Sequence, residues 1–111
     1  MNRPNYIELP ATDIASSQDF YSRAFDWTFT DYGPTYAATT TGDVDVGLQA
    51  DPTHATAAPL PVIQVPDLAA ALNSVRAAGG TITRPPFAYP GGQRFHFRDP
   101  GGNELAAYTP G

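Results

Sequence analysis

Few side chains in this 111-residue chain could carry acid–base chemistry, and three of them lie in stretches expected to form strands. Glu8 lies in the first hydrophobic stretch, and Glu104 begins the last one. His96 could donate a hydrogen bond to a ligand or exchange a proton near neutral pH. The alternative is structural: Glu is mostly exposed in proteins, and His96 could be a surface strand residue between Arg94 and Arg98.

The residue types that the chain lacks exclude several chemistries. The absence of cysteine excludes disulfides, thiolate metal sites and thiol nucleophiles. All six basic residues are arginine, so lysine Schiff-base chemistry is also excluded. The seven Asp residues of the first half lack the spacing of a calcium loop and fit helix caps and turns. No phosphate loop, dinucleotide fingerprint or nucleophile elbow occurs, so the catalytic residues, if any, stay unknown.

The composition predicts one globular domain over residues 1–111, because 41% of the residues are hydrophobic and thirteen are aromatic. No membrane-length apolar run or signal peptide is visible, so we expect a cytoplasmic protein. The formal charge of −5 argues against nucleic-acid and anionic-membrane partners. A neutral or cationic small molecule fits this charge better, although mild acidity could serve solubility alone.

A short pattern occurs twice, 54 residues apart: a strand, then Pro and Asp, then a helix and further strands. Asp13 and Asp67 are good N-caps, and Gly79–Gly80 is a good helix end. The order βαβββ-βαβββ predicts an α+β fold with mostly antiparallel sheet. The expected organisation is a first module at about 1–52, a linker at about 53–59 and a second module at about 60–111.

Periodicity assigns faces to two of these elements. The first helix carries four residues on one face: Phe20, Tyr21, Ala24 and Phe25. Residues 93–98 alternate, with Arg94 and His96 on one face and Phe95 and Phe97 on the other. The proline-rich residues 84–92 that precede this strand read as a loop.

Three motifs resemble the vicinal oxygen chelate superfamily, which includes glyoxalases, bleomycin resistance proteins and dioxygenases. They are Asp13 with Phe20–Tyr21 and Phe25–Asp26–Trp27, then Val65–Pro66–Asp67 through Gly79–Gly80, and then Phe97 to Asn103. The resemblance implies two βαβββ modules that form a cup-shaped mixed sheet. It also implies a homodimer, with ligand crevices at or near the dimer interface in the bleomycin resistance proteins.

Enzymes of this family hold a divalent metal in the cup with His, Glu or Gln. The corresponding positions here are Tyr6, Gly47 (within one residue), Leu60 and Ala106. These side chains cannot form a site for Zn²⁺, Ni²⁺ or Fe²⁺. The sequence therefore predicts no metal site and no cofactor, and it makes metal-dependent glyoxalase or dioxygenase chemistry doubtful.

Alternation along the strands extends these positions into a lining for the cup, since residues two apart share a face. With Asp45 as a further acidic group, the predicted ligand-binding residues are Tyr6, Glu8, Trp27, Tyr36, Gly47, Gln49, Gln64, His96, Glu104, Ala106 and Tyr108. Gly47 and Ala106 would leave room for a ligand. The alternative for Trp27 is core packing, and Tyr6 and Tyr108 could be core or interface aromatics.

Three functions fit this lining. The first is a metal-independent protein that sequesters an aromatic or cationic organic molecule, such as an antibiotic. Its acidic groups would attract the ligand and its aromatic side chains would stack on it. The second is a glyoxalase-like lyase or isomerase with non-standard or absent metal ligands, with Glu8 or His96 as acid or base. The third is a structural or regulatory module whose cup is closed by its own aromatics.

Overall fold

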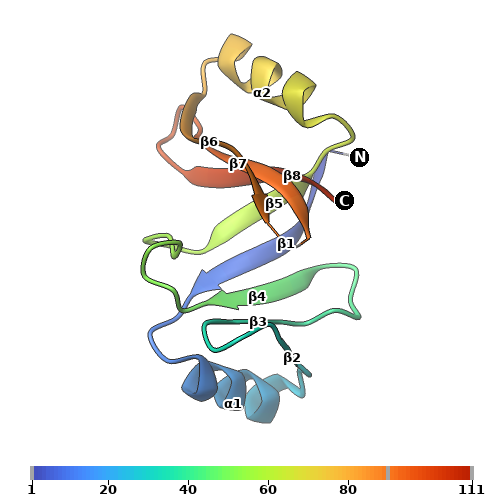
Figure 1. Cartoon of the computed structure of the whole chain (residues 1–111), viewed down its shortest axis with the longest axis vertical. Coiled ribbons are helices and arrows are strands. Elements are labelled where there is room, and N and C mark those ends of the chain that lie inside the picture. Colours follow the sequence, from blue (N-terminus) through green and yellow to red (C-terminus); the bar gives the residue numbers. More distant parts are fainter. Residues whose placement is uncertain (1, 90, 111) are drawn as a thin grey trace. The chain divides into compact units, whose positions relative to one another are not determined.

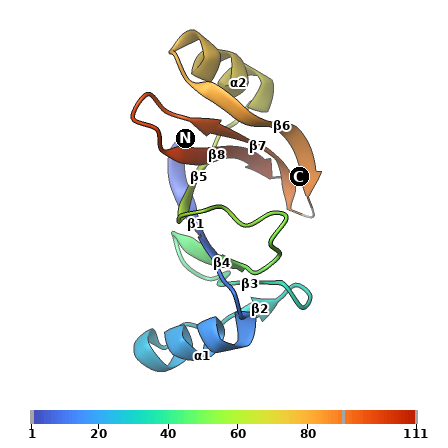
Figure 2. The same cartoon turned by 90° about the vertical axis from the view of Figure 1, so that its left-hand side faces the viewer.

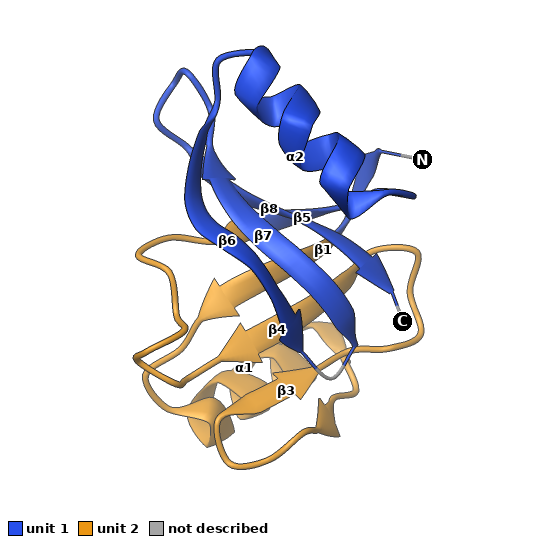
Figure 3. Cartoon of the chain, turned by 45° about the horizontal axis from the view of Figure 1, so that its top comes forward, with its two compact units in different colours: residues 1–5, 61–111 blue, residues 6–60 orange. Residues whose placement is uncertain are grey.

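The structure, a computed structural model, describes residues 2–89 and 91–110. Its elements follow the order βαβββ-βαβββ, which confirms the predicted α+β fold (Figure 1). Contacts divide the chain into two compact units (Figure 3): unit 1 contains residues 1–5 and 61–111, and unit 2 contains residues 6–60. The first five residues thus group with the second module rather than the first. Neither helix of the described chain is long and apolar enough to cross a membrane.

Unit 2 consists of a four-stranded mixed sheet and one helix. Its strands are ordered β2-β3-β4-β1, with β1 parallel to β4 and the other neighbours antiparallel. The elements are β1 (Arg3–Pro10, in this unit from residue 6), α1 (Ile14–Phe25), β2 (Thr30–Asp31), β3 (Tyr36–Ala38) and β4 (Asp45–Gln49). Asp13 caps α1 as predicted, because its carboxylate accepts a hydrogen bond from the Ala15 amide at 3.1 Å.

The surface of α1 carries exposed aromatic side chains. Phe20 and Phe25 are 58% and 60% exposed, so the predicted helical face is not a core face. Tyr21 instead stacks on Trp27, with ring centroids 4.9 Å apart, and Trp27 also contacts Phe25 and Phe29. This group of rings, the α1 aromatic cluster, fixes the chain as it leaves the helix.

Unit 1 consists of four further strands and the helix α2, which lies along β6, β7 and β8 (Figure 2). Its strands are ordered β5-β8-β7-β6, with β5 parallel to β8 and the other neighbours antiparallel. The elements are β5 (Leu60–Gln64, in this unit from residue 61), α2 (Leu68–Ala77), β6 (Thr81–Tyr89), β7 (Gly92–Arg98) and β8 (Glu104–Pro110). The Asp67 carboxylate caps α2 by accepting from the Ala70 amide at 3.0 Å.

The core of unit 1 lies between α2 and one face of its sheet. Val65, Leu68, Phe95 and Ala107 form this core, and Phe97 packs against it. The predicted alternation of β7 is therefore confirmed: its phenylalanines face α2, and its even-numbered residues face the other way. We call that opposite surface of the sheet the polar face of unit 1.

The prediction of a loop over residues 84–92 is wrong for residues 84–89 and 92, because β6 continues to Tyr89 and β7 begins at Gly92. Residue 91 is in a turn, and residue 90 lies outside the described residues. Pro85 and Pro86 lie within β6, where the pairing with β7 shifts register on both sides of Arg84. Proline has no amide hydrogen and is tolerated in an edge strand or at a bulge. β6 is the last strand in the order of unit 1, so it is an edge strand, and the register shifts supply the bulge.

Candidate functional site

Three strands of unit 2 bring a carboxylate and two phenols together. Glu8 of β1 and Gly47 of β4 are partners in the ladder, and Tyr36 comes from the neighbouring strand β3. The Tyr36 hydroxyl donates to Glu8 Oε1 at 3.1 Å, and the Tyr6 and Tyr36 hydroxyls are hydrogen-bonded to each other. Glu8 is only 2% exposed, so this carboxylate is buried on the face that strand alternation predicted. We call these residues the Glu8 cluster.

Gly47 permits the Glu8 cluster to form. A Cβ atom at this position would overlap the hydroxyls of both Tyr6 and Tyr36. The space expected above Gly47 is thus occupied by the two phenols. Burial, and next the charge of Glu8, raise the pKa of the Tyr36 hydroxyl, which keeps it protonated as a donor to the carboxylate.

The other predicted residues of unit 2 hold loops or pack on the helix. Asp45 Oδ1 accepts from the Thr39 hydroxyl at 2.9 Å and the Gly42 amide at 3.0 Å, which closes the turn before β4. Gln49 Oε1 accepts from the amide of Asp51 at 3.0 Å. Trp27 belongs to the α1 aromatic cluster. None of these three has a described hydrogen bond or ring contact to Glu8 itself.

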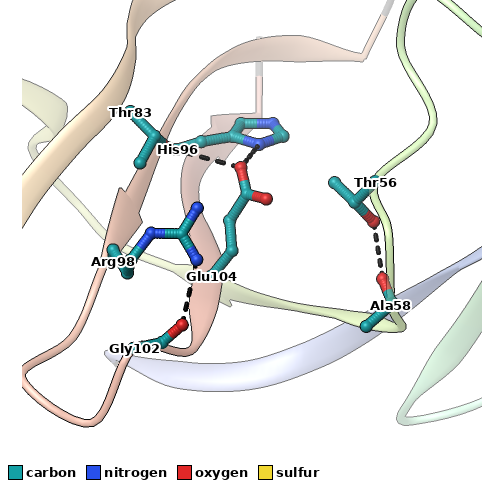
Figure 4. A network of polar contacts seen from close by, with 7 residues as sticks. All are labelled: Thr56, Ala58, Thr83, His96, Arg98, Gly102 and Glu104. Atoms are coloured by element: carbon teal, nitrogen blue, oxygen red, sulfur yellow. Dashed lines mark hydrogen bonds and ion pairs between the residues drawn. The ribbon is translucent and has the colours of Figure 1, made fainter.

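The polar face of unit 1 holds a histidine–glutamate pair (Figure 4). His96 Nδ1 lies 3.1 Å from Glu104 Oε2, and the Thr83 hydroxyl donates to the same oxygen at 3.3 Å. His96 is fully buried, and its Nε2 has no hydrogen-bond partner among the residues described. Burial is the main cause that lowers the pKa of His96, the charges of Arg94 and Arg84 add to it, and the bond to Glu104 opposes it.

The same face holds a second hydrogen-bonded group. Asn5 donates from Nδ2 to Gln64 Oε1 at 2.7 Å and accepts from the Tyr108 hydroxyl at 3.0 Å. Ala106 is fully buried and is paired with His96 in the β7–β8 ladder. The structure therefore brings Gln64 and Tyr108 together, and separately His96 and Glu104, as residues of one sheet face.

Sequence reasoning missed the residues that support these groups: Asn5, Thr83, Arg84, Phe87 and Arg94. Arg94 alternates with His96, which is a signal that could have identified it. Arg84 and Phe87 gave no such signal, because they are three residues apart and share a face only through the register shift between them. His96 was weighed against a surface role, and its complete burial rules that role out.

The residues at the family's metal-ligand positions do not fit a metal. Leu60 and Ala106 are buried and apolar, and Gly47 is covered by phenol hydroxyls. In the part of the chain that the structure describes, no three His, Cys, Asp or Glu side chains come together. A hollow of about 660 Å³ lies elsewhere in unit 1, between the start of α2 and the β6–β7 hairpin, and no predicted ligand-binding residue lines it.

One comparison with known proteins identifies a family. The model of the Glyoxalase/Bleomycin resistance protein/Dioxygenase superfamily matches residues 3–107. No curated protein sequence matches the chain.

Solved structures show the same fold. A Legionella pneumophila protein described as an NAD-dependent benzaldehyde dehydrogenase is 20% identical, with a TM-score of 0.79 over 97% of this chain and 100% of that one. Methylmalonyl-CoA epimerase from Mycobacterium tuberculosis is 12% identical and has a TM-score of 0.79. The match covers 98% of this chain and 88% of the epimerase. A glyoxalase/bleomycin resistance protein/dioxygenase superfamily member from Vibrio splendidus 12B01 is 18% identical and has a TM-score of 0.74. The match covers 94% of this chain and 96% of that protein. At these identities the likeness concerns the fold.

Proposed function

Since the chain belongs to the Glyoxalase/Bleomycin resistance protein/Dioxygenase superfamily, we propose that it is a metal-independent binding protein for an aromatic or cationic organic molecule. The observation that carries this proposal is the Glu8 cluster. At the positions where enzymes of the family hold a metal, this chain has residues that cannot ligate one. A buried carboxylate and two tyrosine hydroxyls meet at one of these positions, Gly47. An antibiotic is one ligand of this kind.

The chemistry of the Glu8 cluster suits a positively charged ligand group. A buried carboxylate attracts a cation more strongly than an exposed one, because less water screens the charge. Tyr36 donates a hydrogen bond to Glu8, which holds the carboxylate in place. The rings of Tyr6 and Tyr36 offer flat surfaces for stacking and for cation–π contact.

Isothermal titration calorimetry with a panel of cationic aromatic compounds tests this proposal. We expect at least one compound to bind, and we expect Glu8→Gln to weaken it at least about tenfold, since loss of a charge-assisted contact costs about 1.5–3 kcal/mol. Asp19→Asn is the matched control, because Asp19 is an exposed carboxylate of α1 that pairs with Arg23. If no compound binds, the module closed by its own aromatics becomes the better reading.

The proposal includes a homodimer, which membership of the family suggests, and residence in the cytoplasm. Sedimentation equilibrium measures the first: a mass near twice 11.8 kDa is expected, and a monomer at all concentrations would contradict it. Gln64, Glu104 and Tyr108, which lie on the polar face of unit 1, stay predicted ligand-binding residues.

A second candidate function is a metal-free lyase or isomerase of the glyoxalase type, and the His96–Glu104 pair favours it. A histidine held at Nδ1 by a carboxylate presents Nε2 as a base. Elemental analysis of protein purified without added metal separates a metal enzyme from both proposals, because stoichiometric Zn, Ni, Fe or Mn would contradict both. A turnover assay that depends on His96 would then favour the enzyme over the binding protein.

A further inference from the structure

The two helices of this chain differ in where their apolar side chains lie. Leu68 of α2 is buried in the core of unit 1, whereas no residue of α1, which the structure describes completely, is buried. Phe20 and Phe25 of α1 are instead 58% and 60% exposed. Among the residues described, exposed large hydrophobic side chains occur only in unit 2. Aromatic side chains gathered on one exposed helix indicate a contact with another molecule.

A hollow of about 420 Å³ lies on the exposed side of α1. The residues that line it are all exposed: Ser16, Asp19, Phe20, Arg23 and Ala24. The first four follow the spacing i, i+3, i+4, i+7, which on an α-helix frames the hole that receives one side chain of a second helix. Ser16 and Ala24, at the two ends of the hollow, are small and let that second helix approach closely. The hollow therefore has the form of a site for another helix.

The charges beside Phe20 match those of a second copy of the same helix. The side chains of Asp19 and Arg23 are 63% and 79% exposed, and they form an ion pair of 3.2 Å. In an antiparallel pair of helices related by a two-fold axis the order of the two charges is reversed, so each Asp19 comes within reach of Arg23 of the second copy. Asp19 and Phe20 are the middle residues of α1 (Ile14–Phe25), so a pair centred on Phe20 overlaps along the whole helix.

From these observations we infer that two copies of this chain dimerise through α1, packed antiparallel on the face that lines the hollow. Phe20 of each copy enters the hollow of the other, and ion pairs between Asp19 and Arg23 flank it on both sides. The inference rests on the homodimer of the proposed function and assigns its interface. Two helices of this length bury less than the about 800 Å² per partner of a typical stable interface, so we expect a dimer that dissociates at measurable concentrations.

Sedimentation equilibrium of Phe20→Ala tests the contact of the aromatic side chain. Aromatic residues at the centre of an interface carry much of its binding energy, so the dissociation constant of the dimer should rise at least about tenfold. Phe20 is exposed in the single chain, so the variant should keep its circular dichroism spectrum. Val44→Ala is the matched control, because Val44 is 53% exposed, belongs to the same unit and does not line the hollow. It should leave the dissociation constant unchanged.

Two charge variants test the antiparallel arrangement. Asp19→Arg makes the face basic and Arg23→Asp makes it acidic, so each variant alone should dimerise at least about threefold more weakly than the unchanged chain. Mixed in equal amounts, the two variants should form a heterodimer that is tighter than either homodimer, because opposite charges then meet across the interface.

The outcomes separate this inference from the proposed function. An unchanged dissociation constant in Phe20→Ala, or a mixture of the charge variants no tighter than the separate variants, would overturn the inference and leave a homodimer through another surface. A monomer at all concentrations would contradict both the inference and the homodimer. Titration of cationic aromatics reads the Glu8 cluster, which shares no residue with this face of α1, so ligand binding and the α1 interface can each fail alone.

Discussion

The substitution Gly47→Ala tests whether the two phenols close over the middle of β4. The added Cβ would overlap both hydroxyls and would lie 2.8 Å from Cζ of Tyr6, so both side chains must move. Overpacking of this kind costs about 1–3 kcal/mol. Weakening the Tyr36–Glu8 hydrogen bond, which involves a charged group, adds to the loss by about 1 kcal/mol or more. We therefore expect about 2–4 kcal/mol of destabilisation.

Thermal and urea unfolding measure this loss. At about 4 °C per kcal/mol for a domain of this size, the melting temperature should fall by about 8–16 °C. Gly101→Ala is the matched control, because its Cβ would meet no atom closer than 3.3 Å, and it should change stability by less than about 1 kcal/mol.

A double-mutant cycle identifies the cause of the Gly47→Ala loss. In a background of Tyr6→Phe and Tyr36→Phe the hydroxyl overlaps are gone, and the same substitution should cost at least about 1 kcal/mol less. Equal costs in both backgrounds, or a loss no larger than that of Gly101→Ala, would show that the phenols do not occupy this space.

Two further predictions concern stability. Because the pKa of His96 is below its ordinary value of 6.5, the unfolded chain takes up a proton before the folded chain does. The free energy of unfolding should therefore fall as pH drops below about 6.5, towards the lower folded pKa of His96. It should fall less in His96→Gln. Identical pH profiles of the two proteins in urea unfolding would refute this. Asp67→Ala removes the cap of α2 and should cost about 0.5–2 kcal/mol, while Asp67→Asn should cost less; equal losses in the two variants would contradict a capping role.

The sequence predicted the repeated order of elements because its signals are local. Asp13 and Asp67 cap helices through contacts with amides two or three residues away, and the alternation of β7 reflects one face packed on a helix. The extension of β6 through two prolines was not predictable in this way. It depends on the position of β6 at the edge of its sheet and on register shifts that only the pairing with β7 reveals.

The candidate site was predicted in part for a related reason. Strand alternation placed Glu8 on the same face as Tyr6, but it could not show that the tyrosine hydroxyls close over Gly47, since that contact joins three strands. Asp45 and Gln49 were predicted to face a ligand. Their side chains accept hydrogen bonds from backbone amides of nearby turns instead. The neighbours of His96 come from β6 (Arg84 and Phe87) and β8 (Glu104), which is information that no local spacing contains.

The central claim, ligand binding without a metal, is tested most directly by one calorimetric titration performed twice. A cationic aromatic ligand found in the panel is titrated into protein in the presence and in the absence of excess EDTA. We expect the same dissociation constant in both titrations, since none of the residues at the family's metal positions can hold a metal. Loss of binding in EDTA, restored by a divalent cation, would contradict it.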